Sequence, residues 1–175
     1  MAQYFMRIIL PIKLALAAGI INCIAWFGVA KSLGYYSLNI GQYRYFITLF
    51  LLVLGVLISI YYERKKQSGF IEYKEAVKSG VIFSLVLAII ISVFNYVYYK
   101  FIRSDVIDFF VSEEKKAWLA NNRTLEETNK YIIEYYIPSY GFFHILMTTL
   151  FLGVIISLVS GALFRKKNPH SFSTN

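Results

Sequence analysis

The chain has few of the residues from which catalytic and metal sites are usually built. Its only cysteine is Cys23, which excludes an intrachain disulfide and a zinc site with several cysteine ligands. Its two histidines stand in no HExxH or ExxH pattern, and neither has a cysteine pair beside it. A GxSxG nucleophile motif and a glycine-rich loop followed by lysine are also missing. We therefore expect no enzyme, no cofactor, and no catalytic or metal-binding residue.

Charged residues are scarce as well, at 16% of the chain, whereas 58% of its residues are hydrophobic. Soluble domains carry roughly 25% charged residues, so this composition and the positive mean hydropathy indicate a chain that largely faces lipid. The formal net charge of +8 comes from basic residues that lie between and beyond the apolar runs. The positive-inside bias and attraction to anionic lipid explain such a distribution, so we expect no nucleic-acid partner.

Apolar residues are concentrated in runs that are long enough to cross a bilayer. Each run approaches the ~20 residues needed to span ~30 Å of hydrocarbon as a helix, and none has a charged residue in its middle. Backbone groups in lipid must be satisfied internally, so these runs are helices. The predicted fold class is an all-α polytopic membrane four-helix bundle, one domain over residues 1–175, with spans at about 14–30, 45–62, 77–99 and 142–164.

The segment between the third and fourth spans, about residues 103–138, is too polar to cross a membrane. Apolar residues recur at helical spacing from Ile107 to Trp118, which predicts an amphipathic helix. Asn121–Asn122 interrupts this pattern, and Thr124–Glu127 matches a capping box at the start of another helix. We expect two short amphipathic helices that fold over the outer mouth of the bundle.

Basic residues near the span ends predict the orientation. The connector between spans two and three holds five of the 18 basic residues, whereas residues 100–141 hold six basic and seven acidic ones. Counted over short connectors, this bias places both termini in the cytoplasm. The connector is also the candidate surface for anionic lipid headgroups, to which each basic residue contributes about 1 kcal/mol. A partner protein is the alternative, and the candidate residues are Arg64, Lys65, Lys66, Tyr73, Lys74 and Lys78.

Small residues recur every four positions in the third and fourth spans. Such stripes let helix backbones approach closely and gain dispersion energy. We favour packing within one bundle, because four spans give every stripe a partner, but pairing in a homo-oligomer or with another membrane protein stays open. The candidate helix-packing residues are Gly80, Ser84, Ala88, Ser92, Gly153, Ser157 and Gly161.

The stretch from Gly69 to Gly80, GFIEYKEAVKSG, resembles a domain-of-unknown-function family of small bacterial membrane proteins with four predicted spans. The matching positions are Tyr73, Lys74, Glu75, Ala76, Lys78 and Gly80. The resemblance implies a polar helical region between spans three and four, a basic tail and a bacterial inner-membrane location, but no biochemical activity. Family members often have serine or threonine where this chain has Glu72, a weaker cap. We therefore expect the third helix to begin at Ser68.

These observations favour a non-enzymatic inner-membrane protein that scaffolds or modulates other membrane components. The alternative is a small transporter or pore subunit that acts as an oligomer, and it depends on Asn22, a polar residue well inside the first span, and on the small-residue stripes. An enzyme is the third hypothesis. Its only candidate residues are Asp105, Asp108 and His144, although carboxylates on an exposed helix are usually solvated.

Overall fold

The computed structural model describes residues 2–36, 40–136 and 138–166, and within these ranges the regular structure is helical. The helices α3 and α4 are joined by a single π-helical turn, η1. The elements are α1 (Ala2–Leu33), α2 (Ile40–Lys66), α3 (Tyr73–Val97), η1 (Tyr98–Ile102), α4 (Ser104–Ala120), α5 (Leu125–Tyr136) and α6 (Pro138–Phe164).

Four of these helices are long and apolar enough to cross a membrane, which confirms the predicted all-α polytopic fold. Each helix extends beyond its predicted span because flanking tyrosines and basic residues continue the helix past the apolar run. Such residues belong at the headgroup level, where a helix can end without leaving the interface. The spans are Ile9–Leu33, Gln42–Lys66, Tyr73–Ile102 and Pro138–Phe164.

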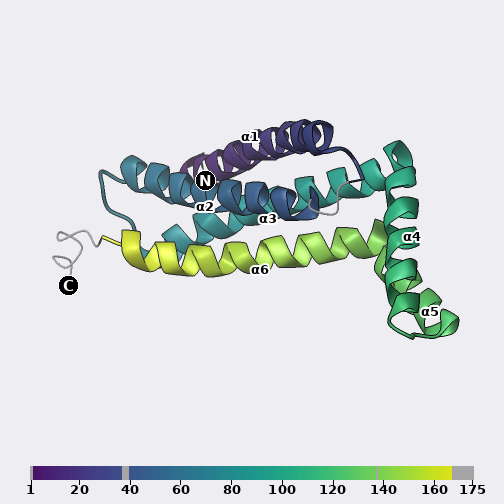
Figure 1. The fold of residues 1–175 in the computed structure, drawn as a ribbon. Helices are drawn as coiled ribbons and strands as arrows, with labels where there is room; N and C mark the ends of the chain where they lie inside the picture. The colour runs from purple at the N-terminus through teal and green to yellow at the C-terminus, as the bar shows by residue number, and fades with distance from the viewer. Residues whose placement is uncertain (1, 37–39, 137, 167–175) are drawn as a thin grey trace.

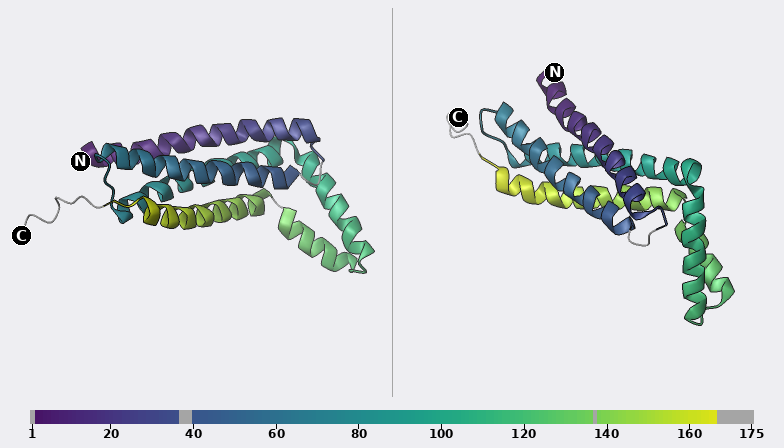
Figure 2. Two further views of the ribbon diagram at one scale, coloured as in Figure 1. Left: turned by 60° about the vertical axis from the view of Figure 1, so that its left-hand side comes forward. Right: turned by 45° about the horizontal axis from the view of Figure 1, so that its top comes forward.

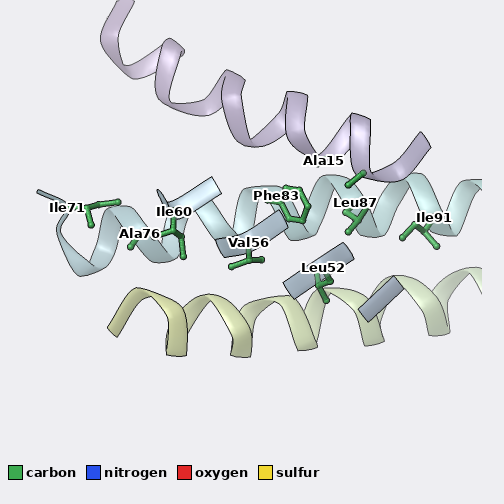
Figure 3. Packing of buried hydrophobic residues seen from close by; sticks show 10 residues of the cluster. Ala15, Leu52, Val56, Ile60, Ile71, Ala76, Phe83, Leu87 and Ile91 are labelled. Carbon is green, nitrogen blue, oxygen red and sulfur yellow. The ribbon is translucent and has the colours of Figure 1, made fainter. Parts of the chain in front are cut away.

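Helix α3 lies at the centre of the bundle and packs against α1, α2 and α6, most extensively against α6 (Figure 1). Figure 3 shows α1 and α6 on opposite sides of α3, and Leu52, Val56 and Ile60 of α2 in the same buried cluster as side chains of α3. The buried core includes Phe83 and Leu87 from α3 and Leu52 and Val56 from α2. The start of α1 and the end of α6 lie at one end of the bundle, here called the termini end (Figures 1 and 2).

The connector between α2 and α3 is a tight turn at the termini end. Ser68 and Gly69 have φ values of 55° and 88°, and the Gly69 amide donates to the Arg64 carbonyl over 3.0 Å. Beyond the turn, Ile71 and Lys166 form two backbone hydrogen bonds of 3.0 Å, one in each direction. This pair of residues connects the loop between α2 and α3 to the end of α6. The chain is thus extended where the sequence predicted helix.

Helix α3 begins at Tyr73, so the predicted start at Ser68 is wrong. The left-handed backbone at Ser68 and Gly69 cannot continue a right-handed helix. Glu72 occupies the N-cap position without a side-chain capping bond, as the absence of serine or threonine there had indicated.

Helices α4 and α5 form an antiparallel hairpin at the opposite end of the bundle, here called the hairpin end. The predicted capping box is confirmed: the Glu127 amide donates to Thr124 Oγ1 over 3.2 Å, and the Thr124 amide donates to the Glu127 carboxylate over 3.3 Å. The hairpin does not cover the mouth as predicted. Only the first part of α4 lies over the bundle, and the rest extends past α6 (Figures 1 and 2), because the chain turns at Arg103 (φ −138°, ψ 54°).

Candidate functional site

The predicted helix-packing residues are all buried, and several of them form the contact between α3 and α6. A Cβ atom at Gly80 would collide with Ser157, and one at Gly153 would collide with Ser84. The serine hydroxyls donate within their own helices, Ser84 to the Gly80 carbonyl over 2.8 Å and Ser157 to the Gly153 carbonyl over 2.6 Å. In this contact between the two helices, here called the α3–α6 seam, the hydroxyls of Ser84 and Ser157 are therefore satisfied, whereas the buried hydroxyl of Ser92 on the same face of α3 has no hydrogen-bond partner.

The predicted lipid or partner surface lies at the termini end, where most of its residues are exposed. Arg64 is the exception, because it is partly buried and its Nε donates to the Gly69 carbonyl over 2.9 Å, which holds the turn. Lys66 lies 3.4 Å from the buried carboxylate of Glu63. The exposed members are Lys65, Lys66, Tyr73, Lys74 and Lys78.

At the hairpin end, Arg103 and Asp105 fix the direction in which α4 leaves the bundle. Arg103 Nη2 donates to Asp105 over 2.8 Å, and the Tyr36 hydroxyl donates to the same carboxylate over 2.7 Å. The Arg103 guanidinium also lies 4.0 Å from the centre of the Tyr35 ring. The hydrogen bonds from Arg103, followed by that from Tyr36, hold the pKa of Asp105 well below its usual range. Asp105 is thus a charged structural partner of Arg103.

A groove opens beside this network, between α2 and α6, and Arg44 lies at its centre. Arg44 is partly buried in the first turns of α2, with its guanidinium carbon 5.4 Å from the centre of the Trp26 ring and in contact with the Tyr99 hydroxyl. Two adjoining cavities of about 210 and 330 Å³ share Arg44, His144 and Ile145 in their walls. Arg44 is therefore placed where it reaches both cavities.

Polar side chains line the upper part of this groove. Thr48 accepts a hydrogen bond of 2.9 Å from the amide of Asn22, so its own hydroxyl hydrogen can be donated elsewhere. Asn95 is 6% exposed, lines the larger cavity, and has an amide oxygen without a hydrogen-bond partner. His144 stacks on Tyr140 with the ring centres 6.0 Å apart. A donor thus lines the smaller cavity and a residue with an unsatisfied acceptor lines the larger one, and Arg44 and His144 line both.

The lower part of the groove is apolar. The smaller cavity continues past the threonines to the side chains of Leu49, Leu52, Ile91 and Leu152. The whole groove consequently has a cationic and polar end toward the hairpin and a hydrocarbon end toward the middle of the bundle. This arrangement can bind a molecule that has a polar end and an apolar end, and no serine, cysteine or carboxylate lines either cavity.

The three candidate residues for an enzyme are not brought together. His144 lines the groove, Asp108 lines a separate cavity beside Lys100, and Asp105 is bonded to Arg103. Within the described ranges, no group of three or more histidine, cysteine or acidic residues could hold a metal ion. The other histidine, His170, lies outside the described residues.

Sequence reasoning missed the groove because Arg44 lies one residue before the predicted second span and was not among the candidate site residues. A cation within the first turns of a span, one helical turn before Thr48, was a usable signal. Intramembrane or interfacial charges commonly mark functional sites. The partner of Asn22 and the site of Asn95 depended on how the helices pack.

The comparison with known proteins agrees with the resemblance seen in the connector. A family model described as a protein of unknown function, DUF4199, matches residues 13–166. No curated protein and no solved structure matches the chain. The match covers all but the first four residues of the four spans, together with the hairpin between the third and the fourth. The chain belongs to the DUF4199 family of proteins of unknown function.

Proposed function

We propose that this membrane protein is not an enzyme and that it scaffolds or modulates other components of a bacterial inner membrane. The observation that carries the proposal is the α4–α5 hairpin, which extends sideways from the bundle with Leu119 and Leu125 exposed near its tip, 44% and 63% respectively. Exposed apolar residues on a projecting hairpin at the membrane surface suit contact with a neighbouring membrane protein or lipid.

The interior of the bundle supports the same proposal. The α3–α6 seam is closely packed, and the hydroxyls of Ser84 and Ser157 within it are bonded to carbonyls of their own helices. Asn22, on which the transport hypothesis depends, donates one of its amide hydrogens to Thr48 within the bundle. If the protein is a transporter or pore subunit, which is the alternative function, its polar path would therefore have to form between the chains of an oligomer.

Photo-crosslinking in native membranes tests the scaffold function. A photoreactive amino acid at Leu119 or at Leu125 should yield the same discrete protein adduct, because both residues belong to one hairpin. The matched control is Phe50, which is 63% exposed on α2 and should give only lipid adducts. Solute or ion flux above that of empty liposomes after reconstitution, with no shared adduct at the hairpin, would support the oligomeric transporter instead.

The proposed orientation places both termini in the cytoplasm, and single cysteines can test it. In a Cys23→Ala background, Ser112→Cys in α4 should react with a membrane-impermeant maleimide on intact cells, whereas Ser68→Cys in the connector should react only after lysis. Both serines are exposed, so access to the reagent depends on the side of the membrane. The reverse labelling pattern would invert the topology.

A further inference from the structure

The groove between α2 and α6 has a cationic, polar end and an apolar end, so it matches a molecule with a charged headgroup and a hydrocarbon tail. We propose that it binds one anionic phospholipid, with the phosphate at Arg44 and part of an acyl chain against Leu49, Leu52 and Leu152. This lipid site goes beyond the scaffold function and does not depend on it.

The charge of Arg44 is the first argument. Among the described residues, no carboxylate lies within ion-pair distance of its guanidinium. Asp105 is already bonded to Arg103 and Tyr36, and Asp108 lines a different cavity beside Lys100. A cation that is partly removed from water without a counterion favours an anionic ligand, and the planar guanidinium fork suits a phosphate.

The hydrogen-bonding groups around Arg44 are the second argument. Thr48 can donate its hydroxyl hydrogen to a phosphate oxygen, because it accepts from Asn22. Asn95 Oδ1 is buried without a partner at the wall of the adjoining cavity, and it can accept a hydrogen bond from a hydroxyl group of the ligand. Phosphate next to hydroxyl groups is the chemistry of a glycerol headgroup.

The apolar part of the groove distinguishes a lipid from a free phosphate. A soluble anion would leave the leucine-lined cavity below Thr48 unfilled, whereas an acyl chain would fill it. Tyr45, 48% exposed, lies at the rim of the groove on the side of α2 that faces lipid. A phospholipid can therefore enter sideways from the bilayer while its acyl chain stays in the hydrocarbon and its headgroup at the interface.

Native mass spectrometry of the full chain, released from nanodiscs of phosphatidylglycerol and phosphatidylcholine, tests this site. The wild type should retain one phosphatidylglycerol in preference to phosphatidylcholine. Arg44→Gln should weaken this retention about tenfold or more, because it removes a charge-assisted bond to phosphate. The matched control, Arg123→Gln, removes an exposed charge from the hairpin and should leave retention unchanged.

Two further variants separate the outcomes. Asn95→Asp keeps the size of the side chain but adds an anion to the cavity wall, and it should also expel phosphatidylglycerol. Leu49→Phe adds volume to the apolar part and should weaken lipid retention while leaving any binding of glycerol 3-phosphate unchanged. Equal retention in wild type, Arg44→Gln and Asn95→Asp would overturn the proposal. Arg44-dependent binding of glycerol 3-phosphate without lipid retention would overturn the acyl-chain part.

Discussion

Replacing Gly153 by valine is expected to lower the free energy of unfolding by about 3 kcal/mol, the upper part of the usual range for overpacking. A Cβ at this position would collide with the Cβ and Oγ of Ser84 across the α3–α6 seam. Ser84 is fully buried, and its Cβ is fixed to the backbone of α3, so it cannot rotate away. The two helices would have to separate along their most extensive contact. Reversible unfolding in mixed micelles, followed by circular dichroism, measures the change.

Two variants control for effects other than the collision. Gly28→Val in α1 introduces the same β-branched residue where no atom lies within 4 Å of the new Cβ, and it should change stability little. Combining Gly153→Ala with Ser84→Gly removes the atoms that clash and should recover most of the stability lost by Gly153→Ala alone. Equal losses for Gly153→Val and Gly28→Val would mean that helix propensity, and not close packing, sets the cost.

Replacing Phe83 by alanine is expected to lower the free energy of unfolding by about 3 to 5 kcal/mol, the usual cost of truncating a buried phenylalanine. The Phe83 ring is fully buried and lies directly against Gly55 of α2, where a Cβ would overlap the ring (Figure 3). Deleting it would leave a cavity between α2 and α3 that lipid cannot reach. The same unfolding experiment measures the loss.

Phe50 provides the matched control for this cavity. It is also on α2 but is 63% exposed on the outside of the bundle. Lipid therefore contacts this position both before and after the Phe50→Ala substitution. Its effect on stability should be below about 1 kcal/mol, since lipid fills the space that the ring leaves. A loss at Phe50 equal to that at Phe83 would show that the ring of Phe83 is not the centre of the α2–α3 contact.

The sequence was sufficient to predict the elements whose cause is local. Four long apolar runs must be helices in lipid. Thr124 and Glu127 cap α5 through hydrogen bonds between residues that are only three positions apart. The start of α3 was misplaced, because the extended backbone at Ile71 results from pairing with Lys166, a residue far along the chain. Local propensity carries no information about that partner.

The candidate groove could not be predicted for the same reason. Arg44 and His144 lie on helices that are separated by α3 and the hairpin in the sequence, and their approach depends on how α2 and α6 are rotated against α3. The pairing of Asn22 with Thr48 likewise joins residues 26 positions apart. Each side chain is ordinary for a membrane helix when considered alone, and only their convergence indicates a binding site.

The central position of α3 has a consequence for biosynthesis. Its glycine and serine face is complementary to α6, and the hairpin of α4 and α5 is synthesised between the two helices. A nascent chain that has inserted α1, α2 and α3 therefore exposes this face to lipid until α6 follows. The face lacks the bulky side chains that would pack well against acyl chains.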